Sequence, residues 1–215
     1  MSELVFLEPN KIDAEPFTTS DVVAEAAGVG YRSTQRLIES QKARLEKFGR
    51  VRFEITPSET KGGVQDRKIY RLNEPQATLL ITFMKNTDRV ADFKVELVRQ
   101  FYAMRAELTR RHAERAALKP IRREMTDVIK QVDDSPWAHK KYTDLAYKVT
   151  IGKVAKKIRE ERGATKKDAA VDYMSADEIH SVTDAQYKIA VLLELGMDYT
   201  AVKSALANRV TLKQA

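Results

Sequence analysis

The sequence predicts a mostly helical α+β fold, in which a winged helix-turn-helix-like domain is followed by a long connecting helix and a helical C-terminal domain. One observation is the order of patterns from residue 20 onward: two helical runs around a glycine turn, two strand-like runs and a third helix. The other is an apolar stripe at helical spacing over residues 90–108. We therefore divide the chain into residues 1–86, residues 87–119 and residues 120–215.

The helix-turn-helix is predicted first. The run FTTSD offers hydroxyl and carboxylate groups that can cap a helix starting near Ser20, and Gly28 ends it because glycine tolerates the left-handed conformation. Small Ala24 allows two helices to cross closely. A second helix is predicted from about Arg32 to Phe48. Its buried candidates are Leu37, Ile38, Ala43, Leu45 and Phe48.

A β-hairpin, or wing, is predicted after the second helix. Residues 51–56 (VRFEIT) alternate apolar and polar side chains as a half-buried strand does, and a polar loop with a Gly-Gly tip separates them from a return strand at 68–73. Asn73 can cap a third helix that has Pro75 in its first turn. A short strand is also predicted at residues 3–7 (ELVFL).

Positive charge is concentrated in the predicted helix-turn-helix and wing. Residues 30–73 carry eleven Lys or Arg and five Asp or Glu, whereas residues 1–29 carry one Lys and six acidic residues, in a chain of net charge +7. Such a segment indicates a polyanionic partner, because Lys and Arg neutralise phosphates and release counterions. The alternative is a plain helical hairpin with a solvated basic face. Predicted base contacts are Arg32, Ser33, Gln35 and Arg36, and predicted phosphate contacts are Lys42, Lys61, Arg67 and Lys68.

The connecting helix is predicted from Val90 to about Leu118, and Pro120 is expected to end it. Its apolar stripe has two interpretations. It either belongs to the core of the chain itself or forms a seam between two copies, since a helix longer than the body it packs on needs another surface. In the second interpretation the dimer interface consists of Val90, Leu97, Phe101 and Met104.

Further helices are predicted in the C-terminal part. Residues 125–132 form an amphipathic run, and Ser135 with Pro136 can start a strongly basic helical region that ends near Gly163. Residues 163–175 are predicted to be a linker or mobile loop. A helix stopped by Gly196 and a last helix capped by Thr200 complete the chain.

Residues 1 to about 110 resemble the phage regulatory protein Rha family. The matching runs are LVFL, TTSDVVAEAAG, RSTQRLIE, RKIYRLNEPQATLLI and ADFKVELVRQFYAMRAEL. The family pattern has a His before the second helix, where this chain has Tyr31 and Arg32. The resemblance implies a phage- or prophage-encoded regulator with a winged-helix-like N-terminal domain. The basic C-terminal part is similar to modules seen on phage antirepressors.

Catalytic and metal-binding patterns are few. There is no Cys, and the three histidines, His112, His139 and His180, lie far apart, so no metal site and no cofactor are expected. Asp133 and Asp134 precede a predicted helix start, where acidic side chains favour the helix dipole. No phosphate-binding glycine motif follows the Walker pattern. We expect a binding protein and not an enzyme.

The leading hypothesis is a phage transcriptional regulator of antirepressor type that binds double-stranded DNA through the winged helix-turn-helix and forms a homodimer or higher oligomer. The alternative is an antirepressor that grips a phage repressor and never reads DNA itself. A nuclease has no residue constellation to support it. No apolar run is long enough to span a bilayer and no basic leader is visible, so we expect a cytoplasmic protein without membrane association.

Overall fold

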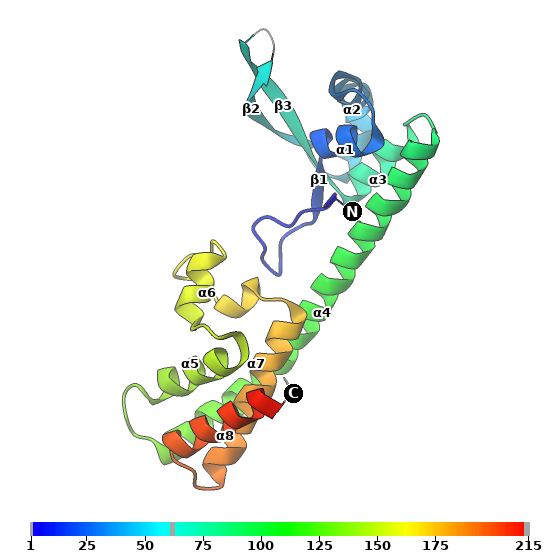
Figure 1. Cartoon of the computed structure of the whole chain (residues 1–215). Coiled ribbons are helices and arrows are strands. Elements are labelled where there is room, and N and C mark those ends of the chain that lie inside the picture. The colour runs from blue at the N-terminus through cyan, green and yellow to red at the C-terminus, as the bar shows by residue number, and fades with distance from the viewer. Residues whose placement is uncertain (1, 61–62, 213–215) are drawn as a thin grey trace. The chain divides into compact units, whose positions relative to one another are not determined.

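The computed structural model of the chain describes residues 2–60 and 63–212 (Figure 1). The described chain is mostly helical and has a small antiparallel sheet near its N-terminus, as the sequence predicts. In chain order the elements are β1 (Phe17–Thr19), α1 (Ser20–Ala27), α2 (Tyr31–Leu45), the 3-10 helix η1 (Glu46–Phe48), β2 (Arg52–Thr60), β3 (Gly63–Asn73), α3 (Glu74–Thr82), α4 (Asp88–Val132), α5 (Ala138–Ile151), α6 (Ala155–Glu161), the 3-10 helix η2 (Ala170–Tyr173), α7 (Ala176–Glu194) and α8 (Tyr199–Leu212).

The chain divides into two compact units. Unit 1 comprises Met1–Glu8 and Ala14–Ala106, and unit 2 comprises Pro9–Asp13 and Glu107–Ala215. The division falls within α4, whereas the sequence-based boundaries lie at residues 86 and 119. The division into residues 1–86, 87–119 and 120–215 stays a prediction.

The sheet of unit 1 has the strand order β1-β3-β2, with antiparallel pairing throughout. The strand predicted at residues 3–7 is wrong, because only an isolated bridge between Phe6 and Phe17 forms there. β1, which the sequence does not predict, pairs with β3. The Ser20 hydroxyl accepts a hydrogen bond from the Tyr70 backbone N–H at 3.0 Å, directly after the last β1–β3 residue pair, Thr19↔Arg71. Side-chain capping of α1 is therefore also wrong, and its N-cap residue, Thr19, makes no side-chain cap bond.

The wing extends further than the sequence indicates. Strands β2 and β3 pair from Arg52↔Arg71 to Thr60↔Gly63, well into the predicted loop. The expected half-burial of β2 is wrong, since Phe53 and Ile55 are 47% and 62% exposed. The described part of the hairpin projects beyond the helices of unit 1 (Figure 1).

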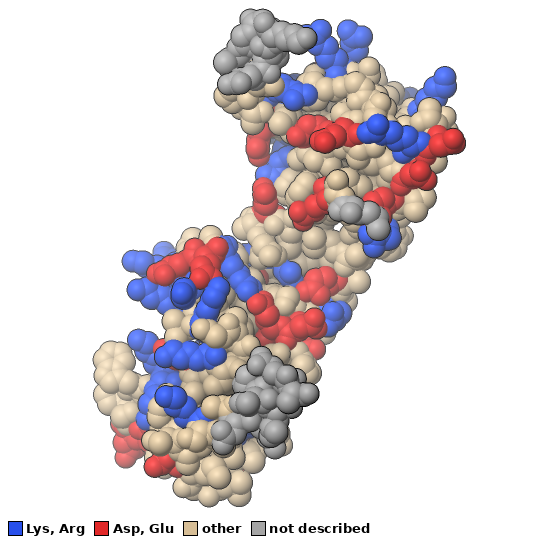
Figure 2. Space-filling model, in the orientation of Figure 1, with Lys and Arg blue, Asp and Glu red and all other residues tan. Residues whose placement is uncertain are grey.

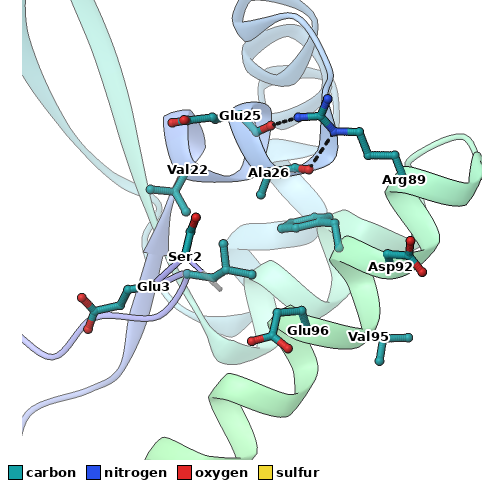
Figure 3. Close-up of a pocket in the computed structure, with 11 residues that line it drawn as sticks. Ser2, Glu3, Val22, Glu25, Ala26, Arg89, Asp92, Val95 and Glu96 are labelled. Atoms are coloured by element: carbon teal, nitrogen blue, oxygen red, sulfur yellow. Dashed lines mark hydrogen bonds between the residues drawn. The ribbon is translucent and has the colours of Figure 1, made fainter.

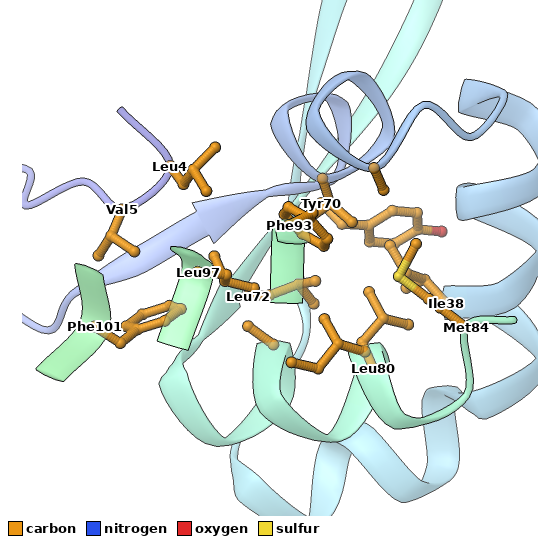
Figure 4. Close-up of a cluster of buried hydrophobic side chains, with 14 of the residues drawn as sticks. Leu4, Val5, Ile38, Tyr70, Leu72, Leu80, Met84, Phe93, Leu97 and Phe101 are labelled. Carbon is orange, nitrogen blue, oxygen red and sulfur yellow. The ribbon is translucent and has the colours of Figure 1, made fainter. Parts of the chain in front are cut away.

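The core of unit 1 lies between the sheet and helices α1 to α4 (Figure 4). Asn73 caps α3, as predicted, and together with Gln76 it forms a capping box. Of the predicted core residues in the second helix, Ile38 and Leu45 are buried and Leu37 packs against the core. Ala43 and Phe48 are exposed, which is a correction. Phe48 lies beyond the end of α2 at Leu45, in η1.

The apolar stripe of α4 packs inside its own chain. Val90, Leu97 and Phe101 are buried in the core of unit 1, and Met104 is partly buried against it (Figure 4). This is the intrachain interpretation of the stripe. A contact between two copies would therefore have to use other faces of unit 1 or unit 2, and the oligomeric state stays a prediction.

Helix α4 continues through Pro120, so the predicted helix end there is wrong, and residues 125–132 are part of the same helix. A proline inside a helix removes one hydrogen bond and costs about 3 kcal/mol. Packing on both sides offsets this cost, because Leu118 and Met125 are almost fully buried in unit 2.

Unit 2 has two hydrophobic clusters. One joins α4, α5, α7 and α8, and the other surrounds Leu118, Ile158 and Val171. The predicted linker at 163–175 is wrong, because it contains η2 and buried side chains of this second cluster. Two predicted caps are also wrong. Trp137 and not Ser135 occupies the N-cap of α5. At the start of α8 the Asp198 carboxylate, and not the Thr200 side chain, accepts the Ala201 backbone N–H, at 2.8 Å.

Residues 9–13 belong to unit 2 although they lie near the N-terminus. The Ile12 N–H donates to the Asp172 carbonyl at 2.8 Å, and the Lys11 ammonium donates to the Asp168 carboxylate at 3.1 Å. The Ile12 side chain is buried. In the described ranges, no helix is long and apolar enough to cross a membrane.

Candidate nucleic-acid interface

The turn between α1 and α2 is held by backbone geometry. Gly28 ends α1 with a left-handed conformation (φ 65°), and its N–H points to the carbonyls of Ala24 and Glu25. The Val29 N–H donates to the Ala24 carbonyl at 2.9 Å, and Gly30 is the N-cap residue of α2. The helix-turn-helix geometry predicted from Ala24 and Gly28 is therefore present.

The first two turns of α2 carry exposed cationic side chains. Arg32, Ser33 and Arg36 are exposed, and within the described part of the chain their side chains form no hydrogen bond or ion pair. Leu37 packs against the core, and Thr34 is 1% exposed. One face of the helix is thus anchored while the two guanidinium groups extend into solvent.

Gln35, the fourth predicted base contact, is already engaged. Its amide nitrogen donates to the Lys68 carbonyl at 2.8 Å and to the Tyr31 phenol oxygen at 2.7 Å. The Tyr31 phenol in turn donates to the same carbonyl at 2.6 Å. The structure thus places Gln35 between α2 and the wing, and its amide donors are not available to a base without breaking these bonds.

Two of the predicted phosphate contacts lie against aromatic rings. The Arg67 guanidinium is 4.0 Å from the centre of the Tyr31 ring. The Lys68 ammonium is 4.2 Å from the Phe53 ring centre and 3.9 Å from the Glu39 carboxylate. A hydrogen bond to the Tyr70 phenol raises the pKa of Lys68, so this side chain stays charged at neutral pH.

The other two phosphate candidates differ from each other. Lys42 is exposed on α2 and forms only a long ion pair with Glu46, at 3.8 Å, one turn further along the helix. Exposed pairs of this kind are weak, about 0.3–0.5 kcal/mol, so a phosphate can replace the carboxylate. Lys61 lies outside the described residues.

On α2, the predicted contacts that remain open to a ligand are thus Arg32, Ser33, Arg36 and Lys42. Tyr31 is the residue that sequence reasoning missed. The only sequence signal for Tyr31 is its position four residues before Gln35, on the same face of the helix. Nothing near Tyr31 in the sequence indicates that the Lys68 carbonyl is its hydrogen-bond acceptor. Figure 2 shows Lys and Arg side chains gathered around the end of unit 1 that carries α2 and the wing.

This arrangement can bind a polyanion. Long cationic side chains at the start of a helix can reach base edges in a major groove while neighbouring cations meet phosphates. The wing is joined to α2 by two hydrogen bonds to the Lys68 carbonyl, from Tyr31 and from Gln35, and the Gln35–Tyr31 hydrogen bond within α2 orients these two donors. Both elements can therefore approach one ligand together.

The remaining candidates for chemistry have structural explanations. The Asp133 carboxylate accepts a hydrogen bond from Lys141 at 2.6 Å and one from the Ser135 N–H, which lower its pKa to about 2. Across residues 2–60 and 63–212, no three His, Cys, Asp or Glu side chains are placed to hold a metal ion.

One family matches part of the chain. The model of the phage regulatory protein Rha family matches residues 18–106, which confirms the resemblance seen in the sequence. This is a family of regulatory proteins and not of enzymes. No curated protein matches the chain. The family match ends where unit 1 ends, and the likeness of the C-terminal part to antirepressor modules stays a prediction.

Proposed function

Residues 18–106 form a domain of the phage regulatory protein Rha family, and from this premise we propose that the chain is a phage or prophage transcriptional regulator that binds double-stranded DNA through α2 and the wing. Its place of action would be the cytoplasm. The observation that supports this most is the pair of exposed guanidinium groups, Arg32 and Arg36, at the start of a helix whose opposite face is buried.

In this proposal Arg32 and Arg36 read base edges, since a guanidinium can donate two hydrogen bonds to a guanine. Ser33 offers a shorter contact beside them. Lys42 and the wing cations Arg67 and Lys68 contact phosphates and release counterions, which gives a steep dependence of affinity on salt. Gln35 acts through Tyr31 and Lys68 by keeping the wing in position.

The test is a titration of the full chain against DNA from the regulatory region of the encoding phage and against scrambled DNA, at two salt concentrations. Arg32→Ala and Arg36→Ala should each weaken specific binding by about 1–3 kcal/mol. Arg123→Ala is the matched control, because it removes an exposed guanidinium from unit 2. If the double variant binds as tightly and selectively as the control, α2 does not read DNA.

A second candidate is a protein antagonist that binds a phage repressor. It is supported by unit 2, which has two hydrophobic clusters of its own and contributes no residue to α2 or the wing. A mobility-shift assay with the phage repressor separates the two functions. Loss of the repressor's shift without a new band supports antagonism, and a shift by this chain alone supports DNA binding.

We also propose that the chain acts as a homodimer, because two-fold symmetric proteins commonly read paired half-sites. The stripe of α4 packs within its own chain, so we place the interface of this dimer on another surface. Light scattering at about ten micromolar, where a dimer of ordinary affinity is populated, tests this. A monomer at that concentration argues against it.

A further inference from the structure

A surface pocket of about 790 Å³ lies in unit 1, and none of its lining residues belongs to α2 or the wing. It is formed by α1, the first turns of α4 and residues 2–4 (Figure 3). Its lining residues are Ser2, Glu3, Leu4, Val22, Glu25, Ala26, Arg89, Asp92, Phe93, Val95 and Glu96.

The floor of the pocket is apolar. Leu4 and Phe93 are buried there, and Val22 is half-buried at the side. Val95 is 70% exposed at the edge. An apolar side chain that entered the pocket would cover this surface and gain the corresponding burial energy.

The rim of the pocket is acidic. Glu3, Glu25 and Asp92 form no ion pair with any side chain that the structure describes. The cation of the pocket, Arg89, donates instead to the backbone carbonyls of Glu25, at 2.7 Å, and Ala26, at 3.2 Å (Figure 3). Figure 2 shows Asp and Glu side chains gathered over α1 and the first turns of α4.

The fourth acidic side chain is neutralised within the chain. Glu96 accepts hydrogen bonds from Arg99, at 2.7 Å, and from Gln100, and these lower its pKa to about 2. The unpaired negative charge of the rim therefore comes from the three other carboxylates. These carboxylates are negatively charged, whereas α2 and the wing carry positive charge, so the rim of the pocket repels DNA.

We propose that this pocket is a docking site for a protein partner, and that it takes a basic amphipathic segment. An apolar side chain of the segment enters the pocket between Val22 and Val95, while its Lys or Arg groups face Glu3, Glu25 and Asp92. This goes beyond DNA binding, because it assigns a second partner to residues of the same domain that are outside α2 and the wing. It holds whether or not α2 reads DNA.

The experiment uses the full chain and three labelled synthetic helical peptides of equal length, followed by fluorescence anisotropy. The first peptide has leucines on one face and lysines on the other. The second keeps the lysines and has serine in place of leucine. The third keeps the leucines and has glutamate in place of lysine. The first should bind about tenfold or more tightly than either of the others.

Two variants locate the binding. Glu25→Lys with Asp92→Lys should weaken binding of the first peptide by about tenfold, and Val95→Ser should weaken it several-fold without a change of charge. Glu124→Lys with Glu194→Lys is the matched control, because it makes the same charge change at exposed sites of unit 2. Circular dichroism melts establish that each variant folds.

Three results would overturn the proposal. One is equal affinity of the charge-reversed and control variants for the first peptide. Another is equal binding of the lysine–serine and lysine–leucine peptides, which would leave the apolar floor without a role. The third is absence of binding of the first peptide at about 100 μM, a weak limit even for transient protein contacts.

Discussion

The Tyr31 phenol donates a 2.6 Å hydrogen bond to the backbone carbonyl of Lys68, and this contact joins the first turn of α2 to the base of the wing. Gln35 donates to the same carbonyl from one turn further along the helix. The two elements that we propose to contact DNA are thus connected through a single backbone atom, and the wing cannot move without breaking both bonds.

Tyr31→Phe should lower the free energy of unfolding by about 1 kcal/mol, because it removes one donor from a partly buried carbonyl but keeps the ring under Arg67. Urea unfolding measures the change. Tyr102→Phe is the control, since it removes an exposed phenol from α4 and should have almost no effect. An equal loss in both variants would mean that the Lys68 contact does not stabilise the fold.

Thr34→Val should raise the free energy of unfolding by about 1 kcal/mol. The Thr34 hydroxyl is buried and has no hydrogen-bond partner in the described structure, and a methyl group of the same shape avoids the cost of burying it. Chemical unfolding monitored by circular dichroism is the measurement. Thr78→Val, at an exposed site of α3, should bring no such gain. A destabilised Thr34→Val variant would indicate that the hydroxyl has a partner in solution.

Gly28→Ala should lower the free energy of unfolding by about 1–3 kcal/mol, for two reasons. The residue has a left-handed backbone, and an added Cβ would lie 2.6 Å from the Arg89 Nε atom. Gly152→Ala is the control, because Gly152 has a similar φ of 75° but open space around its Cβ position.

Combining Gly28→Ala with Arg89→Ala isolates the contact. The double variant has no Arg89 side chain for the new methyl group to displace. The sum of the losses of unfolding free energy in the two single variants should therefore exceed the loss measured in the double variant. Strict additivity would mean that the Arg89 side chain moves away without cost.

Acid should destabilise unit 2 partly through Asp133. Its carboxyl has a pKa of about 2 in the folded chain, below its ordinary value of about 3.9, because Lys141 and the Ser135 N–H bind the charged form. The stabilisation is therefore fully present above about pH 4 and is lost as the pH falls toward 2. Asp133→Asn should flatten the stability profile in this window. Asp134→Asn, at the exposed neighbour, should leave it unchanged.

Elements whose signals are local could be predicted from the sequence. Asn73 and Gln76 start α3 within three residues of each other, and Gly28 ends α1 by its own backbone conformation. The order of helices and strands in unit 1 follows from such signals. The exposure of Arg36 beside half-buried Leu37 follows from the helical period alone.

Features that depend on distant partners could not be predicted. Tyr31 and Lys68 are 37 residues apart, so nothing near either residue shows that Gln35 supports the wing instead of facing a base. Pro120 breaks a helix by local rules, yet burial on both sides of it keeps α4 continuous. The alternation of β2 indicates a strand, but whether another layer covers Phe53 is decided by the rest of the fold.

The placement of residues 9–13 in unit 2 has a consequence for synthesis. Lys11 is separated from its partner Asp168 by 157 residues, and a ribosome adds about 5–20 residues per second. The loop that carries Ile12 therefore leaves the ribosome on the order of ten seconds before the residues that bury it exist. During that interval the nascent chain would carry an apolar side chain that chaperones can bind, and unit 2 could close only after most of the chain had been translated.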